Sequence, residues 1–247
     1  MSKILGINFF NGEVDQAIDR MCQGGGFLVA PSGTCFARLT RDEIYREAMI
    51  NADIAIADSG LMVLLWKIWR GETLTRISGW KYLCSLSSRF FNEKTHAVLW
   101  IVPNEQARER AAQWLRENNF PFSEYDFYVA PIYDRVVEDR FLLEMLDRLQ
   151  PGHVVVGVGS GPQEKLGYYL REHLNYRPSI HCIGAALGFL TGDQPPIPMW
   201  ADRFYLGWLL RLLRQPSVFI PRSLRALELP FLIARYGEEL PPLKEKN

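Results

Sequence analysis

The segment 154–164 passes from an apolar run through three glycines directly into a helix start. Residues 154–158 predict a buried parallel strand, because a short apolar run that ends at glycines is typical of such strands. Ser160-x-x-Gln163, with Pro162 between them, has the form of a capping box with proline in the first helical turn. Backbone N–H groups and the positive dipole end at such a helix start attract anions. The segment therefore predicts a turn that binds phosphate, and a diphosphate fits it.

A nicotinamide dinucleotide fits the same turn poorly. The spacing Gly157-x-Gly159-x-x-Pro162 breaks the dinucleotide fingerprint at its third glycine, the residue that lets the helix pack closely on the strand. A nicotinamide oxidoreductase of similar fold is therefore the least favoured of three hypotheses, and NAD(P) binding would test it. We expect structural roles for the four histidines, which are scattered singly: His96, His153, His173 and His181.

Short apolar runs alternate with helical patterns along most of the chain. We expect strands at residues 4–9, 27–30, 54–57, 97–102, 127–130, 154–158 and 180–183, and the firmest helices at 42–52, 105–118, 134–149 and 161–174. This alternation predicts an α/β fold, a Rossmann-like parallel sheet flanked by helices. Ligands of such sheets bind outside the carboxyl ends of the strands, so the loops at that edge are where a site is expected.

The alternation stops at a proline-rich stretch, residues 192–198, and the pattern beyond it is helical only. We therefore expect an α/β domain at 1–192 and a helical appendage at 193–247. Residues 199–236 hold six arginines against two acidic residues, and on a helical wheel Arg203, Arg211 and Arg214 share one side while aromatic and leucine side chains share the other. That profile is typical of a helix on an anionic membrane surface, although a helix with a core-facing side and a solvated basic edge explains it equally well.

Composition and the terminal sequence limit which partners and which cell compartment we expect for the protein. The 28 basic and 28 acidic residues balance, so no overall field attracts nucleic acid. Four cysteines without C-x-x-C spacing predict reduced thiols in a cytosolic protein. The first residues lack the pattern of a signal peptide, and no apolar run approaches the roughly 20 residues of a membrane span.

Two residues near the carboxyl edge are candidates for chemistry. Asp58 follows the expected strand at 54–57 and precedes Ser59-Gly60, so its carboxylate is either a general base at the edge of the sheet or an N-cap of the next helix. Arg76 lies in a loop before another helix and either pairs with phosphate in bidentate fashion or is an ordinary surface residue.

Further polar groups surround these two. Ser32 and Thr34 follow the expected strand at 27–30 and form either a polar lip of the site or a plain turn. Gln163 and Glu164 in the first turn of the phosphate-type helix either bind a sugar or nucleoside or complete the helix cap. No D-x-D occurs, which removes the usual metal bridge to a diphosphate, so helix N–H groups and arginine would have to meet its charge.

Taken in order and spacing, these segments resemble the WecG/TagA/CpsF family, glycosyltransferase family 26, over nearly the whole chain. The segments that carry the resemblance are Ala52-Asp53 with Asp58-Ser59-Gly60, Arg76-x-x-Gly79, Gly159-x-x-Pro162-Gln163-Glu164, the glycine-rich stretch 183–192, and Trp208-x-x-Arg211 with Gln215-Pro216.

The resemblance implies an inverting, metal-independent transfer of a hexose or N-acetylhexosamine from a UDP-sugar to a polyprenyl-diphosphate-linked saccharide. This reaction would take place at the cytoplasmic face of the membrane, during synthesis of a cell-surface polysaccharide. The resemblance further implies a peripheral membrane protein that binds no cofactor, metal or nucleic acid and that could form a homo-oligomer. By the same likeness Asp58 is the base, Arg76 and Gln163 bind substrate, and Arg222 or Arg225 of the appendage contacts the acceptor diphosphate. From their place in the loops at the same edge, we also expect substrate binding by Ser32, Thr34, Gly159, Ser160 and Glu164.

The chain departs from the family pattern at several polar positions. The family's Thr-x-Asn is Ala30-Pro31-Ser32 here, its Phe-Asp is Gly188-Phe189, and its Arg-Ala-Pro is residues 196–198. The transferred sugar therefore need not be the N-acetylmannosamine of the best-known members. The same departures motivate the alternative hypothesis of a non-catalytic protein that binds nucleotide sugars or acts as a membrane scaffold.

Overall fold

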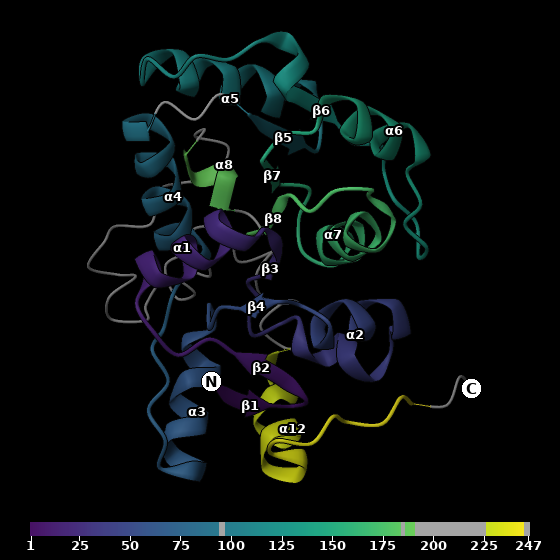
Figure 1. The fold of residues 1–247 in the computed structure, drawn as a ribbon. Helices are drawn as coiled ribbons and strands as arrows, with labels where there is room; N and C mark the ends of the chain where they lie inside the picture. Colours follow the sequence, from purple (N-terminus) through teal and green to yellow (C-terminus); the bar gives the residue numbers. More distant parts are fainter. Residues whose placement is uncertain (94–96, 184–185, 191–225, 245–247) are drawn as a thin grey trace.

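A computed structural model describes residues 1–93, 97–183, 186–190 and 226–244, which form an α/β fold around one eight-stranded sheet (Figure 1). The strand order is β1-β2-β4-β3-β8-β7-β5-β6, and every pairing is parallel except that of β1 with β2. The strands are β1 Ser2–Ile4, β2 Ile7–Phe9, β3 Gly26–Val29, β4 Ile54–Ala55, β5 Val98–Val102, β6 Phe127–Val129, β7 His153–Val156 and β8 Ser179–Cys182. The predicted fold class is confirmed.

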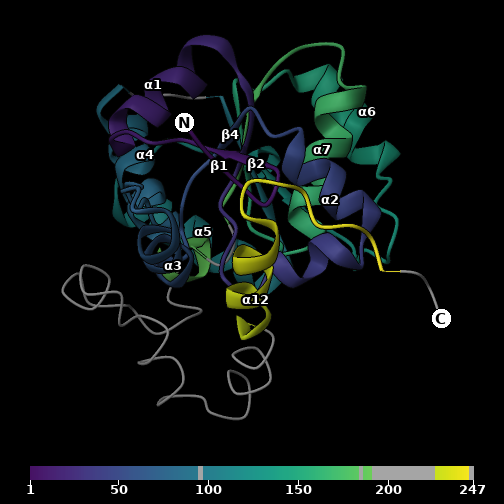
Figure 2. The ribbon, with the colours of Figure 1, turned by 90° about the horizontal axis from the view of Figure 1, so that it is seen from below.

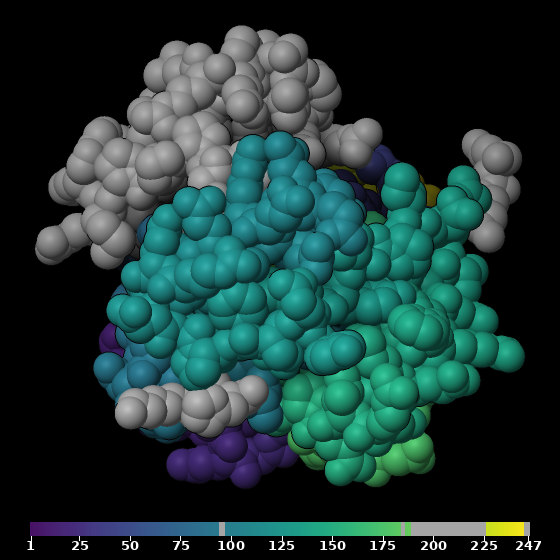
Figure 3. Space-filling model, turned by 90° about the horizontal axis from the view of Figure 1, so that it is seen from above, coloured from purple at the N-terminus to yellow at the C-terminus, as the bar shows by residue number. Residues whose placement is uncertain are grey.

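Helices cover both faces of the sheet (Figure 1). The described helices are α1 Val14–Gly24, η1 Phe36–Thr40, α2 Glu43–Ile50, α3 Gly60–Arg70, α4 Gly79–Glu93, α5 Glu105–Glu117, η2 Glu124–Asp126, α6 Arg140–Leu149, α7 Pro162–His173, α8 Ala186–Leu190 and α12 Glu228–Tyr236. Seen from above, the teal and green residues of α5 and α6 close the β6 end of the molecule (Figure 3).

Two apolar clusters, one on each face, hold these layers together. Along β7, Val154 and Val156 belong to one cluster and Val155 to the other, as the two-residue period of a strand requires. The first cluster includes buried side chains of α2, α3, α6, α7 and α12, and the second those of α1, α4, α5 and α8. Every strand of the centre is thus buried on both sides, which explains why these strands are continuous apolar runs in the sequence.

The structure corrects the single strand expected at residues 4–9. Leu5 and Gly6 have φ angles of 50° and 82°, and this tight turn folds the segment into the antiparallel pair β1 and β2. A two-residue turn with positive φ at both positions matches the twist of a hairpin. The mostly apolar segment concealed this turn, because leucine is a rare residue at a position with positive φ.

One predicted helix start and one predicted helix cap are wrong. The helix expected from residue 134 begins at Arg140, because the Asp139 carboxylate caps it by accepting a hydrogen bond from the Leu142 amide at 3.0 Å. The capping box expected at Ser160 and Gln163 lies one residue later: the Gly161 amide donates to the Glu164 carboxylate at 2.6 Å, and α7 begins at Pro162.

The last described segment packs on the α/β body beside α3 (Figure 2). Leu229, Leu232 and Ile233 of α12 are buried in the first cluster, and the amides of Leu5 and Gly6 donate to the carbonyls of residues 237 and 238 at 2.9 Å. The structure describes only residues 226–244 of the expected appendage, and the boundary at residue 192 stays a prediction. Among the described helices, none is both long and apolar enough to cross a bilayer.

Candidate functional site

Three loops converge at the carboxyl edge of the sheet, where the sequence predicted the site. The loop after β3 meets the loop after β7 through Cys35, whose sulfur lies 2.8 Å from the Ser160 hydroxyl. The same loop meets the residues after β4, since a Cβ on Gly33 would stand 3.0 Å from the Ser59 hydroxyl. Residues from β3, β4 and β7 therefore form one continuous polar edge.

Asp58 lies at this edge directly before α3. One oxygen of its carboxylate accepts a hydrogen bond from the Gly79 amide at 3.0 Å, and its backbone carbonyl accepts one from the Arg76 side chain at 3.0 Å. Asp58 is not the N-cap of α3, because the Ser59 hydroxyl takes that role by accepting from the Met62 amide at 3.2 Å. Asp58 is partly exposed while Ser59 is buried. Of the two interpretations of Asp58, capping is therefore wrong, and a general base is compatible with the geometry.

Gly79 packs closely against the ends of β8 and β3, next to Asp58. A Cβ on Gly79 would stand 2.9 Å from the Ile183 carbonyl at the end of β8 and 3.8 Å from the Ala30 side chain at the end of β3. Only a residue without a side chain allows this close approach. Gly79 thereby fixes the amide that holds the Asp58 carboxylate.

The turn between β7 and α7 has the glycine conformations that a phosphate-binding turn requires. Gly159 and Gly161 have φ angles of 91° and 103°, a region that side chains rarely adopt. The Gly161 amide is bound by Glu164, and the Gln163 amide donates to the Gly159 carbonyl at 3.2 Å. Two of the predicted phosphate donors of this helix start thus have internal partners.

Arg38 of η1 supplies a cation at the same turn. A Cβ on Gly161 would collide with the Arg38 guanidinium, so this group lies directly against the start of α7. The guanidinium also lies over the Tyr45 ring at 5.9 Å. Within the described part of the chain, no carboxylate forms an ion pair with Arg38. Sequence reasoning missed this residue because it lies in a short helix with no recognisable motif.

Gln163 and Glu164 are fully buried rather than facing the edge. The Gln163 side-chain amide donates to the Glu164 carboxylate at 2.9 Å. Burial raises the pKa of the Glu164 carboxyl, while the hydrogen bonds from Gln163 and the Gly161 amide and the charge of Arg38 lower it. In this structure both side chains stabilise the α7 start, and their contact with a sugar stays a prediction.

Hydroxyl groups line the loop after β3. Ser32 lies with its hydroxyl 3.2 Å from that of Thr34 and 3.1 Å from the Cys35 sulfur, and Ser32 and Thr34 are both partly exposed. Burial raises the pKa of the Cys35 thiol, which keeps it protonated and unreactive. The segment is a turn, because the Cys35 amide donates to the Ser32 carbonyl at 2.9 Å, and its hydroxyls meet Ser160 through Cys35. Its role as a lip of the site stays a prediction.

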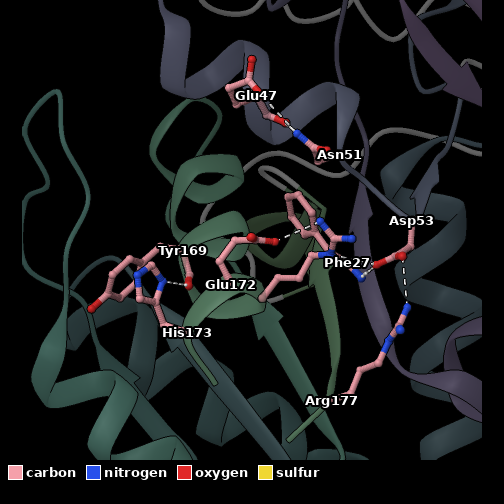
Figure 4. A network of polar contacts seen from close by, with 9 residues as sticks. Phe27, Glu47, Asn51, Asp53, Tyr169, Glu172, His173 and Arg177 are labelled. Atoms are coloured by element: carbon pink, nitrogen blue, oxygen red, sulfur yellow. Dashed lines mark hydrogen bonds and ion pairs between the residues drawn. The ribbon is translucent and has the colours of Figure 1, made fainter. Parts of the chain in front are cut away.

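A different acidic residue of the family-like segment has a structural role. The Asp53 carboxylate accepts from the Phe27 amide at 2.8 Å and pairs with Arg177 at 3.1 Å, at the amino ends of β3 and β4 (Figure 4). Arg171 lies 3.4 Å from the same carboxylate. Asp53 thus lies at the opposite edge of the sheet from Asp58, although only five residues separate them.

Other predicted groups lie elsewhere. Arg222 and Arg225 fall outside the described residues. His181 is fully buried and His153 is partly buried, and their rings stack with centroids 5.5 Å apart, which agrees with the structural roles predicted for them.

All four cysteines are in the described part, and none forms a disulfide. Across residues 1–93, 97–183, 186–190 and 226–244, no three acidic, histidine or cysteine side chains gather as metal ligands.

A cavity of about 520 Å³ lies on the flank of the molecule rather than at this edge. Residues of α6, α7 and the loop before α6 line most of it, among them Leu143, Tyr168 and Tyr169. None of the predicted catalytic or substrate-binding residues is part of its lining.

Comparison with known proteins shows the family to which the chain belongs. The model of the glycosyl transferase WecG/TagA/CpsF family matches residues 2–243, so the chain belongs to this family and is a glycosyltransferase. It is similar to a protein of Bacillus spizizenii named N-acetylglucosaminyldiphosphoundecaprenol N-acetyl-beta-D-mannosaminyltransferase, with 23% identity over 209 residues that cover 83% of this chain and 76% of the relative. The resemblance found in the motifs is confirmed.

Proposed function

We propose that the protein transfers a hexose or N-acetylhexosamine from a UDP-sugar to a polyprenyl-diphosphate-linked saccharide, with inversion at the anomeric carbon. The observation that carries the proposal is the meeting of Asp58, Arg76, Ser160 and Arg38 at one edge of the sheet. The relative's name supports the acceptor class, since it describes transfer to N-acetylglucosamine on diphosphoundecaprenol.

Asp58 acts as the general base in this proposal. Its carboxylate takes the proton from an acceptor hydroxyl while the hydroxyl oxygen bonds to the anomeric carbon. The bond from that carbon to the UDP oxygen breaks on the opposite face, so a single displacement inverts the configuration. The hydrogen bond from the Gly79 amide orients the carboxylate for this step. A positioned base of this kind contributes about 10²–10⁴-fold to the rate.

The UDP diphosphate binds at the turn before α7 in the proposed complex. The Gly161 and Gln163 amides have internal partners, so the amides of Gly159 and Ser160 and the Arg38 guanidinium are the donors placed to meet it. A guanidinium against the leaving group stabilises the charge that develops there, without reorganisation during the step. Arg38 also offsets the charge of the buried Glu164. In the proposed complex these groups meet the charge of the diphosphate without a metal.

The acceptor lipid places the reaction at a membrane. We propose that the protein is peripheral at the cytoplasmic face and that the basic stretch 199–236 binds anionic lipid. Replacement of Arg203, Arg211 and Arg214 by glutamine should weaken attachment to anionic vesicles at low salt. Equal attachment of this variant and the unmodified chain would contradict the role of the stretch.

The most informative experiment is a screen of UDP-sugars by UDP release, with a short-chain polyprenyl-diphosphate N-acetylglucosamine as acceptor. We expect one donor to give acceptor-dependent release, with an inverted glycosidic linkage in the product. Binding of UDP-sugars without release, for every donor and acceptor, would instead favour the non-catalytic alternative.

A further inference from the structure

The helix α3 exposes an apolar face that no described part of the chain covers. Leu61, Leu64 and Ile68 are 39%, 55% and 68% exposed, and they follow one another at three- and four-residue steps. Trp69 beside them is 47% exposed. The other side of the helix is apolar as well, since Met62 and Trp66 pack in the core. A helix that is apolar all round needs an apolar neighbour on both sides.

The adjacent helix α12 extends this surface. Phe231 is 62% exposed and Leu227, at the start of α12, is 67% exposed. The two helices contact each other and lie beside the β1–β2 hairpin (Figures 1 and 2). We call the side chains of Leu61, Leu64, Ile68, Trp69, Leu227 and Phe231 the α3–α12 surface.

Charged groups at the far end of α3 suit a water–lipid boundary. Lys67 and Arg70 are exposed, and α3 has no acidic residue. Arg70 pairs with Glu238, and Glu72 accepts a hydrogen bond from Trp66, so charge around the helix end is nearly balanced. Tryptophan and long cationic side chains commonly lie at the level of lipid headgroups. Apolar insertion, rather than charge, would therefore supply most of the binding.

The size of the surface favours a bilayer over a second copy of the chain. A stable protein interface takes about 20–30 residues from each partner. The α3–α12 surface has six apolar side chains, whereas an interfacial helix needs only one apolar stripe to lie in a bilayer surface.

We propose that the α3–α12 surface inserts shallowly into the membrane and holds the reaction edge against it. α3 begins at Gly60, two residues after Asp58, so the first turn of the inserted helix adjoins the base. This inference rests on the proposed function, because a polyprenyl acceptor presents its diphosphate at the bilayer surface. It adds a contact in the α/β body that is separate from the basic stretch 199–236.

Flotation with vesicles of phosphatidylcholine and phosphatidylglycerol tests this contact with the full chain and without any substrate. The double variant Leu64→Gln/Ile68→Gln should bind vesicles about tenfold more weakly, and the loss should persist at high salt, because apolar insertion is not screened. The matched control is Ile132→Gln/Phe141→Gln, which changes two side chains that are 100% and 69% exposed in other parts of the molecule. This control should float like the unmodified chain.

Two results would overturn the inference. Equal flotation of the Leu64/Ile68 variant and the unmodified chain would contradict the contact. In that case, a lower melting temperature of the variant would show that this part of the α3–α12 surface packs inside the fold. A lower solution mass of the variant would show that it contacts a second copy of the chain. Equal weakening by the Ile132/Phe141 control shows a non-specific effect.

A pair of transfer assays separates this inference from the proposed function. The Leu64/Ile68 variant should lose transfer to a long-chain acceptor in vesicles and keep transfer to a short-chain acceptor in solution. If the unmodified chain transfers no sugar to either acceptor, the proposed function fails while flotation still decides the contact. If the variant transfers normally in vesicles, the contact fails and the proposed function stands.

Discussion

Asp53 and Asp58 flank the same strand, and the two edges of the sheet use them differently. At the amino edge, Asp53 is held by a backbone amide and two arginines, and its contacts join β3, β4 and the segments around α7. At the carboxyl edge, the Asp58 carboxylate accepts from the amide of Gly79, the first residue of α4, and the Asp58 carbonyl accepts from the Arg76 side chain. Both aspartates are partly exposed. The two residues therefore differ in what surrounds them. Asp53 joins two strands to α7 and the segment after it, whereas Asp58 lies beside the hydroxyl groups and glycine turns of the predicted site.

The largest expected effect is on catalysis at the carboxyl edge. Asp58→Asn keeps an oxygen that can accept from the Gly79 amide but removes the base, so kcat should fall about 10²–10⁴-fold. UDP binding should stay unchanged, as measured by calorimetry, and thermal unfolding checks that the variant is folded. Unmodified turnover in this variant would show that Asp58 is not the base.

The next effect concerns Arg38. Arg38→Met keeps the packing on Tyr45 and removes the charge, so kcat/KM for the donor should fall about 10²–10³-fold, as on loss of a preorganised donor to a developing charge. Arg41→Gln is the matched control, because Arg41 is exposed and pairs with Glu228 at 2.6 Å. A loss of stability without a change in donor kinetics would assign Arg38 to the fold alone.

Asp53→Ala should lower the free energy of unfolding and leave kcat unchanged, whereas the Asp58 variant lowers kcat. It leaves the Phe27 amide without its acceptor and removes two ion pairs, so we expect a loss of about 2 kcal/mol in the free energy of unfolding. Below the melting temperature, kcat should be that of the unmodified chain. Urea denaturation and initial rates on the same preparation measure both quantities, and a fall in kcat without destabilisation would break the comparison.

The smallest effect is the pH dependence of the amino edge. Burial lowers the pKa of His153, at the start of β7, from 6.5 to about 4, and lowers that of His181 beside it. Both imidazoles are therefore neutral in the fold, and stability is complete above pH 6.5 and falls as the pH drops toward 4. We expect a loss on the order of 1 kcal/mol between pH 7 and 5.5 in the free energy of unfolding. His153→Gln should reduce this slope, and an unchanged slope would contradict the assignment.

The sequence predicted the layers of the fold well, because buried strands and amphipathic helices have clear periods. It did not predict the hairpin at Leu5-Gly6, where the expected apolar run conceals a turn. It placed Asp58 and the turn before α7 at the correct edge, since parallel strands bring their carboxyl ends together. It missed Arg38 and the true cap at Glu164, because contacts between η1 and α7 depend on how the layers pack.

The most direct test of the account is a crystal structure of the protein with bound UDP. The account predicts the diphosphate against the amides of Gly159 and Ser160 and the Arg38 guanidinium, on the side of the edge where Asp58 lies. A diphosphate in the cavity between α6 and α7, or elsewhere away from this turn, would contradict it.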